Sequence, residues 1–288
     1  MTVTTLSLSK AHKEFLNFLK EKGRASATIL AYGSDLQQLI DFCQKTGQTN
    51  VLKITAKDLE EFKKSLGKDG YTPKSISRKI NSIRTFFKVL VKQKLLTDNP
   101  SVNLTHPKYD VKPPRILSRM EYRALRDACR SDVRISAIIE LFLQSGVRIG
   151  ELAGLELEDI KDSAIFIKPY ESQAGREIPL NKPAKDSLDA YLKSRPKSKS
   201  RILFLTKSGR PFLIRNIRSA IDRYFKLAGI KDATVNDLRH TFIAHQLKAG
   251  VPLVLISRIV GHKRLSTTEK YLKLIKDKSS EKMKIREL

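Results

Sequence analysis

The sequence lacks the features of secreted, disulfide-bonded and membrane-spanning proteins. Its 288 residues include two cysteines, Cys43 and Cys129, and neither belongs to a CxxC pair. They therefore predict buried thiols in a reducing compartment. No apolar run approaches the roughly 20 residues that span a bilayer, and no charged-then-apolar signal peptide begins the chain. We expect a cytoplasmic protein with no membrane as a partner.

Acidic residues are scarce relative to basic ones. The chain has 56 Lys and Arg against 30 Asp and Glu, a formal net charge of +26, and the excess runs through both halves. Such a charge is typical of a protein that lies along a polyanion and binds it in a salt-dependent manner. The composition is otherwise globular, and the length suits two domains that each bury a core.

The first hundred residues predict helices only, beginning near residues 12, 26, 55 and 72. Thr55 and Asp58 have the pattern of a capping box, and Pro73 suits the first position of the fourth helix. That helix has an apolar stripe and an opposite face that can track phosphates or reach base edges in a major groove. A solvated surface is the alternative for this face. Its residues are Lys74, Arg78, Asn81, Thr85 and Lys88.

Prolines at residues 103–115 predict an extended linker between an N-terminal domain, residues 1–102, and a C-terminal domain, residues 116–288. In the second domain, Ser118 and Glu121 predict another capping box. Helical periodicity and strand-like alternation both follow. We expect helices at about residues 118–129, 133–144, 183–194 and 214–228, and strands at 164–168, 177–180 and 202–205, with a turn at 173–175.

Three short helices predicted within residues 232–274 carry an arginine, a histidine and a tyrosine. Arg239 lies beside the apolar face of the first helix. The second ends at Gly261, a natural C-cap, and His262 follows it. Tyr271 lies on the third. These helices are expected at residues 235–248, at 253–260 and from 266.

This combination suits chemistry on a phosphodiester, an anion that repels nucleophiles until its non-bridging oxygens are neutralised. An arginine donates parallel hydrogen bonds to such oxygens and keeps its charge. A tyrosine can attack phosphorus and form a covalent phosphotyrosyl intermediate. The alternative is structural for each residue alone: a surface salt bridge for Arg239 and ring packing for Tyr271.

These stretches resemble the catalytic domain of the tyrosine recombinases. The resemblance implies that Arg148, Arg239 and His262 stabilise the charge on the scissile phosphate. It also implies that Glu151 braces Arg148 and that Tyr271 is the nucleophile. It implies a 3′ phosphotyrosyl bond, a released 5′ hydroxyl and no metal, ATP or other cofactor. The matching segments are Ser145-Gly146-Val147-Arg148-Ile149-Gly150-Glu151-Leu152, Leu238-Arg239-His240-Thr241-Phe242, Gly261-His262 and Thr267-Thr268 with Tyr271.

The N-terminal domain resembles the core-binding, SAM-like domain of the same family. The similar segments are Ser26-Ala27-Thr28, Ile54-Thr55 and Asp98-Asn99-Pro100. The resemblance thus covers nearly the whole chain and implies a mainly α fold. We expect a four-helix core-binding domain, then an α+β tyrosine-recombinase catalytic domain with a small antiparallel sheet.

The resemblance also implies partners. Strand exchange needs double-stranded DNA recombination sites and four active sites, hence a homotetramer or a paired recombinase on DNA. In relatives a charged tail such as residues 276–288 docks on a neighbouring subunit, and Met283, Ile285 and Leu288 are candidate anchors. With no arm-binding domain, the chain is more similar to the compact Xer type, which resolves chromosome dimers in chromosome partition, than to a three-domain phage integrase. A small integrase that serves DNA integration of a mobile element remains the alternative.

Two positions depart from the family. Asn236 stands where a histidine or lysine is usual, three residues before the second arginine, and its amide can donate a hydrogen bond but cannot shuttle a proton. The turn at residues 170–176 contains no lysine, which the family uses as general acid. Lys168, at the end of the preceding strand, is the nearest candidate, whereas the high pKa of Arg176 makes it a poor acid.

The departures favour an alternative function: a catalytically impaired DNA-binding protein of the same fold with an architectural or regulatory role. The intact arginines and tyrosine argue for the enzyme. His240, His245 and His262 also raise the question of a metal site. Their spacing matches no zinc pattern, so we predict no bound metal.

Overall fold

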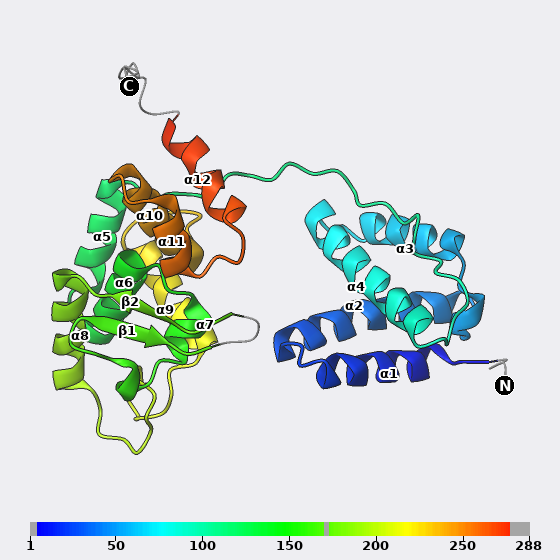
Figure 1. Ribbon diagram of the computed structural model, residues 1–288, viewed down its shortest axis with the longest axis horizontal. Coiled ribbons are helices and arrows are strands. Elements are labelled where there is room, and N and C mark those ends of the chain that lie inside the picture. The colour runs from blue at the N-terminus through cyan, green and yellow to red at the C-terminus, as the bar shows by residue number, and fades with distance from the viewer. Residues whose placement is uncertain (1–4, 170–172, 277–288) are drawn as a thin grey trace, which may run out of the picture. The chain divides into compact units, whose positions relative to one another are not determined.

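The computed structural model describes residues 5–169 and 173–276, and the chain divides into two units, Met1–Val111 and Lys112–Leu288 (Figure 1). Within the described residues, no helix is both long and apolar enough to cross a membrane. The elements of the first unit are α1 (Leu8–Glu21), α2 (Ser26–Lys45), the 3₁₀ turn η1 (Val51–Lys53), α3 (Ala56–Lys68) and α4 (Pro73–Lys92).

Side-chain caps start the last two helices of the first unit where the sequence predicts them. Thr55 caps α3 in a reciprocal capping box, in which the Thr55 amide donates to the Asp58 carboxylate at 2.8 Å. Thr72 caps α4, and Pro73 takes the first helical position, where no N–H is needed. These caps satisfy backbone donors that helix starts otherwise leave unpaired.

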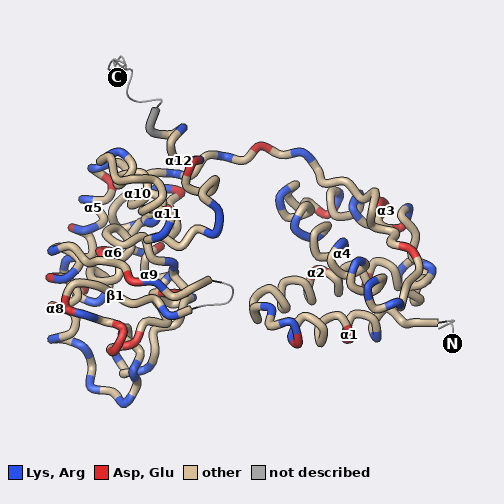
Figure 2. The backbone as a smooth tube through the Cα atoms, in the orientation of Figure 1, with Lys and Arg blue, Asp and Glu red and all other residues tan. Residues whose placement is uncertain are grey.

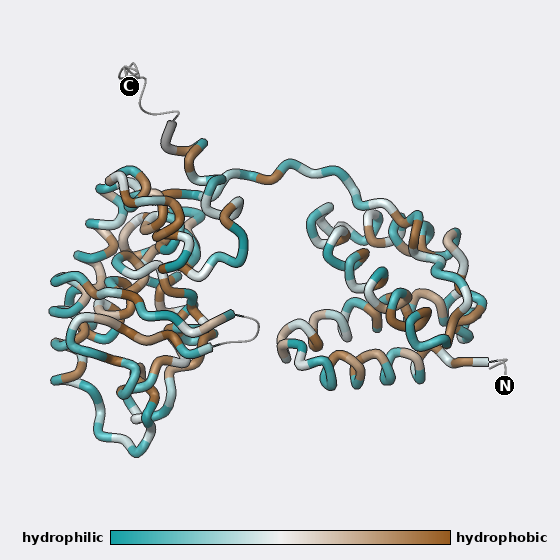
Figure 3. Tube along the Cα trace, viewed as in Figure 1, coloured by the Kyte–Doolittle hydropathy of each residue, from teal (hydrophilic) through white to brown (hydrophobic). Residues whose placement is uncertain are grey.

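The apolar stripe of α4 faces the core of the first unit, and Figure 3 shows apolar and hydrophilic segments alternating along its helices. The five stripe residues, Ile76, Ile80, Ile83, Phe87 and Leu90, are all buried. Most of the predicted nucleic-acid face therefore points away from this core, but the guanidinium of Arg78 pairs with the buried Asp35. The side chains of this face are exposed at Lys74, Arg78, Asn81 and Lys88 and half-buried at Thr85.

The second unit is built around α6, which packs against four other helices of that unit. Its apolar run is buried because neighbours cover it on several sides. The helices are α5 (Arg119–Cys129), α6 (Val133–Ser145), α7 (Ile149–Ala153), the 3₁₀ turn η2 (Leu157–Asp159), α8 (Lys182–Ser194), α9 (Ile214–Leu227), α10 (Val235–Lys248), α11 (Leu253–Val260) and α12 (Ser266–Lys276).

The sheet of the second unit is a two-stranded antiparallel pair, β1 (Ala164–Ile167) and β2 (Arg176–Pro179). The register sets Ala164 opposite Pro179 and Ile167 opposite Arg176. This confirms the mainly α fold with a small antiparallel sheet. It also confirms the thiols as core residues, since Cys43 and Cys129 are both buried and free.

The predicted strand at residues 202–205 is wrong. Ile202 and Leu205 form only isolated bridges, to Glu156 and to Pro211. A proline has no N–H to donate, so the second pairing cannot extend into a ladder. Leu203 and its neighbours are buried in the core. A short buried segment of irregular structure is as rich in apolar residues as a buried strand, so composition alone does not distinguish the two.

Candidate active site

Arg148, the first arginine of the site, follows a tight turn at the end of α6. Gly146 ends that helix in the left-handed conformation, with φ of 60°. A Cβ at this position would collide with Cδ1 of Phe242 on α10. Glycine is thus required both by the backbone angle and by the close approach of α10. Two residues later, Arg148 is the N-cap of α7.

Four hydrogen bonds hold Arg148 in place. Its backbone amide donates to Oε2 of Glu151 at 2.8 Å, and its Nη1 donates to Oε1 of Glu151 at 2.9 Å. Nη1 also donates to Oε1 of Gln173 at 2.8 Å, and Nη2 donates to the carbonyl of Gly261 at 2.6 Å. The side chain remains 32% exposed. Contacts within the protein therefore orient the Arg148 side chain, and part of it remains accessible to an anion.

The second arginine lies deeper. Arg239 is only 8% exposed on α10, and its guanidinium donates to the carbonyls of Gly146 and, at 2.6 Å, of Val260. Burial, with a contribution from Arg148, lowers its pKa to about 9. The group is still mainly cationic at neutral pH. A bound anion would offset the cost of burying this charge.

Three arginines converge on the end of α11. The consecutive carbonyls of Ile259, Val260 and Gly261 accept from Arg176, Arg239 and Arg148 respectively. The last carbonyls of a helix have no partner within it and carry partial negative charge. The sequence reaches this geometry by ending α11 at Gly261, whose φ of 65° turns the chain sharply. The result is a cluster of cations with the next residue, His262, beside it.

His262 completes the cluster. Its Nδ1 lies 2.8 Å from Oγ1 of Thr268 on α12, which leaves Nε2 for a substrate. Burial, reinforced by the charges of Arg239, Arg148, His240 and Arg176, lowers the pKa of His262 to about 4. The imidazole is therefore neutral at pH 7 in this arrangement. The same charges that lower its pKa favour an anion.

Tyr271 lies on α12 and is 5% exposed. Its ring centroid is 5.9 Å from that of His240, at an angle of 59°. Burial raises the pKa of the Tyr271 hydroxyl, Arg239 counteracts the rise and Asp237 adds to it. The phenol is therefore protonated at neutral pH and must lose its proton when it attacks.

The structure brings together Arg148, Glu151, Arg239 and His262, and it adds two residues that sequence reasoning left out of the site. Arg176 donates from Nη1 and Nη2 to both oxygens of Glu151, at 2.9 and 2.8 Å. Although burial alone would raise it, the hydrogen bonds from Arg176 and Arg148 hold the pKa of Glu151 below its ordinary value. Gln173 brings the turn into the site through its bond to Arg148.

The structure describes Asn236 and Lys168, the two residues considered at the departures from the family. Asn236 is exposed in the first turn of α10. Nζ of Lys168 donates to Glu156 at 2.6 Å and to Glu158 at 2.9 Å, and the hydrogen bond to Glu156 is the main cause of its raised pKa. A lysine held by carboxylates gives up its proton less readily. The turn residues 170–172 and the tail anchors lie outside the described residues.

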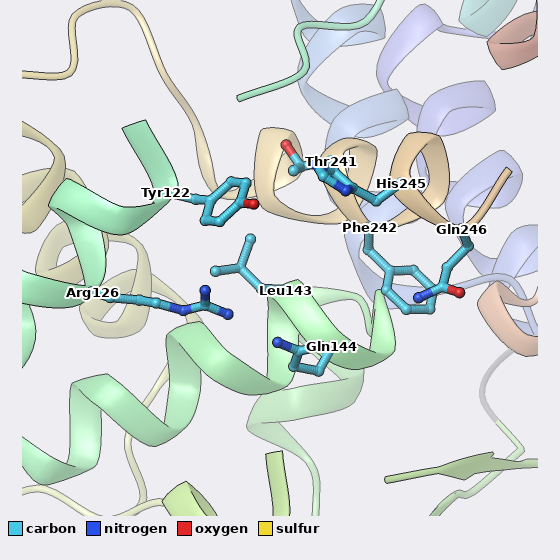
Figure 4. A pocket seen from close by; sticks show the side chains of 8 residues that line it. All are labelled: Tyr122, Arg126, Leu143, Gln144, Thr241, Phe242, His245 and Gln246. Atoms are coloured by element: carbon cyan, nitrogen blue, oxygen red, sulfur yellow. The ribbon is translucent and has the colours of Figure 1, made fainter. Parts of the chain in front are cut away.

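No group of three or more His, Cys, Asp or Glu side chains within the described residues could hold a metal ion. A hollow of about 200 Å³ lies elsewhere on the second unit, between α5, α6 and α10 (Figure 4). Tyr122 and His245 meet edge to face in it, with ring centroids 5.6 Å apart. It contains neither Arg148 nor Tyr271, so the cationic cluster is a separate surface site.

Comparison with known proteins decides the family. The phage integrase family matches residues 115–278, and the phage integrase N-terminal SAM-like domain matches residues 13–94. The chain belongs to the phage integrase family. The resemblance seen in the sequence is thereby confirmed, and the chain is a tyrosine-type site-specific recombinase.

This phage integrase family member has relatives that cover nine-tenths or more of its length. It is 32% identical to tyrosine recombinase XerC of Leptospira interrogans over 287 residues, 96% of this chain and 92% of the relative. It is 31% identical to tyrosine recombinase XerD of Staphylococcus haemolyticus over 271 residues, 90% and 92% of the two chains. In fold it is similar to a lambda integrase tetramer bound to a Holliday junction, with a TM-score of 0.77, 18% identity and coverage of 98% and 81%. The catalytically impaired alternative finds no support in these comparisons.

Proposed function

We propose that this recombinase cleaves and rejoins DNA strands with Tyr271 as the nucleophile. The Tyr271 oxygen attacks the scissile phosphorus and loses its proton, the bond from phosphorus to the 5′ oxygen breaks, and that oxygen leaves as a hydroxyl once it is protonated. The enzyme is then joined to a 3′ phosphate. Attack by the 5′ hydroxyl of a partner strand reverses these steps and exchanges strands, so no nucleotide cofactor is consumed.

The convergence of Arg148, Arg239 and His262 at the end of α11 carries this proposal. Charge builds on the non-bridging oxygens as the tyrosine attacks, and preorganised donors stabilise that charge most when they need no reorientation. Both guanidinium groups are already fixed by carbonyl oxygens. We assign to them the clamp on the phosphate, and to His262 a hydrogen bond from Nε2.

Supporting roles follow from the surroundings. Glu151 orients Arg148 through the two bonds described above. Asn236, exposed at the start of α10, is assigned a hydrogen bond to DNA, with no part in proton transfer. Lys168 is retained as the candidate general acid only for a state in which it leaves Glu156 and Glu158 and reaches the 5′ oxygen.

DNA binding is assigned to both units. Figure 2 shows Lys and Arg along each of them, in keeping with the net charge of +26. On α4 the proposed contacts are Lys74, Arg78, Asn81, Thr85 and Lys88, opposite the buried stripe. We propose a core-binding domain at residues 1–102, a linker at 103–115 and a catalytic domain at 116–288, since residues 104–118 contain no helix or strand.

The assembly and the biological event are inferred from relatives. Strand exchange between two duplexes uses four tyrosines, so we propose a homotetramer, or a tetramer shared with a second recombinase. The similarity to XerC and XerD over nine-tenths of the chain favours an Xer-type enzyme, acting on chromosomal DNA in the cytoplasm, over a mobile-element integrase.

The test is to trap the covalent intermediate. Binding sites are first selected from a random duplex library, and each is then nicked near its centre so that cleavage releases a short fragment that diffuses away. A protease-sensitive protein–DNA adduct that Tyr271→Phe abolishes supports the proposal. Tight binding of the selected DNA with no adduct from the native chain refutes the catalytic assignment.

A further inference from the structure

Arg176, the first residue of β2, makes more contacts in the site than a surface strand residue needs. It is 9% exposed and forms a bidentate pair with Glu151, which is 4% exposed. Its Nε donates to the carbonyl of Ile259 at 2.7 Å. All three nitrogens of the guanidinium are thus engaged by the protein, and Arg176 is not itself a phosphate ligand in this arrangement.

The pair matters because Glu151 also binds Arg148. Oε1 of Glu151 accepts from Nη1 of both arginines, each at 2.9 Å. A buried carboxylate with one cationic partner draws that partner into a two-point pair. With Arg176 present, two cations share one negative charge, and Arg148 makes only a single side-chain bond to the carboxylate. Nη2 of Arg148 is thereby left to the carbonyl of Gly261 and is not drawn into a pair with the carboxylate.

Arg176 also packs on the turn into His262. A Cβ at Gly261 would lie 2.9 Å from Cζ of Arg176, so the guanidinium rests on the backbone of this turn. The carbonyl of the same glycine accepts from Nη2 of Arg148. One side chain therefore contacts the Glu151 carboxylate and the end of α11, two of the three groups that orient Arg148.

We propose that Arg176 is a positioning residue that keeps Arg148 free for the scissile phosphate by sharing Glu151 and bracing the turn at Gly261. This inference rests on the proposed function of the site. It deepens that function by giving Arg176, the first residue of β2, a role in orienting Arg148. Arg176 acts on cleavage through Arg148, so its effect must disappear when Arg148 no longer contributes.

A double-mutant cycle on the rate of adduct formation tests this dependence. Arg176→Gln is expected to slow the native chain by about 30-fold, within the range for directly coupled groups. In an Arg148→Lys background the same change is expected to cost less than about 3-fold. Equal factors in both backgrounds would overturn the proposal, because a general loss of structure does not depend on Arg148.

The matched control is Arg126→Gln, which breaks another two-point arginine–glutamate pair, that of Arg126 with Glu140. Arg126 lines the hollow shown in Figure 4, away from the cationic cluster. Arg126→Gln is expected to change the adduct rate by less than about 3-fold. If Arg176→Gln does not fold, Arg176→Lys takes its place, since it keeps the charge and loses the two-point geometry.

A second readout needs no cleavage. Inorganic phosphate is titrated into the DNA-free protein, and binding is followed by the NMR signal of the His262 ring. Arg176→Gln is expected to weaken phosphate binding about 10-fold when Arg148 is present and to leave it unchanged with Arg148→Lys. Unchanged affinity in both backgrounds would overturn the positioning role. Failure of the native chain to form an adduct would instead refute the proposed function, whatever the phosphate result.

Discussion

The guanidinium of Arg239 donates to the carbonyl oxygen of Gly146, 93 residues earlier in the chain. The bond joins α10 to the end of α6, just before Arg148. Phe242, one helical turn after Arg239, closes over the same glycine. Gly146 therefore supplies an acceptor for the second arginine and, by having no side chain, permits the approach of the helix that carries it.

Replacing Gly146 by alanine is expected to destabilise the second unit by about 2–4 kcal/mol, the sum of a strained left-handed residue and an overpacked contact. Cleavage should fall as well, because Arg239 shifts with α10. Gly250→Ala is the matched control. Gly250 also has a positive φ, but a Cβ added there meets nothing within 4 Å. Its replacement is therefore expected to lower the free energy of unfolding by only about 1 kcal/mol. Thermal unfolding measures both. Equal losses would contradict the role of Phe242.

His262 makes stability depend on pH in a defined direction. Its pKa is about 4 in the folded chain, against an ordinary value of 6.5 that the unfolded chain retains, so between these values the unfolded chain binds more protons. Stability from this group is fully present above pH 6.5 and is lost as the pH falls towards 4.

Urea unfolding of the native chain and of His262→Gln between pH 4.5 and 7 measures this effect. The difference in free energy of unfolding between the native chain and the variant should shrink as the pH falls. A bound phosphate should move the NMR titration midpoint of His262 upward, because an anion offsets Arg148 and Arg239. A difference between the two proteins that does not change with pH would contradict the assignment.

Lys168 is held by Glu156 and Glu158, which predicts a small role in cleavage. Lys168→Gln is expected to slow adduct formation less than about 3-fold, whereas loss of a general acid costs roughly 10²–10⁴-fold. The substrate with sulfur in place of the 5′ bridging oxygen is the control, because a thiolate leaves without an acid. A large loss with the oxygen substrate that disappears with the sulfur substrate would establish Lys168 as the acid.

A buried ion network lies within the first unit. Asp35 is fully buried and accepts from Arg78 at 2.7 Å, from the buried Lys79 at 3.1 Å and from Ser82 at 2.8 Å. Asp35→Ala leaves a buried ammonium without its carboxylate and should cost about 3–5 kcal/mol. The exposed Asp41→Ala on the same helix should cost less than about 0.5 kcal/mol. Urea unfolding compares them, and similar losses would contradict this account.

Local signals predicted the elements that carry the site. The helices at residues 235–248 and 253–260 have the expected bounds, because apolar periodicity and Gly261 mark them within the sequence itself. Capping boxes likewise fixed the starts of α3 and α5. Such features depend on neighbours a few residues away, which a sequence displays directly.

The hydrogen-bond network of the site depends on distant partners and was not predictable in this way. Arg176 meets Glu151 across 25 residues and the carbonyl of Ile259 across 83. Neither spacing follows the period of a helix or a strand. A backbone carbonyl also gives no signal in a sequence, because every residue has one. An arginine at the start of a short strand next to a lysine-free turn was the one available signal.

The central claim is that Tyr271 becomes joined to a 3′ phosphate of DNA. Adduct formed on the nicked duplex is digested with protease and nuclease, and the nucleotide-bearing peptide is sequenced by mass spectrometry. We predict a phosphotyrosine at Tyr271 with the nucleotide attached through its 3′ oxygen, and a free 5′ hydroxyl on the released fragment. Attachment at another residue, or through a 5′ phosphate, would contradict the account.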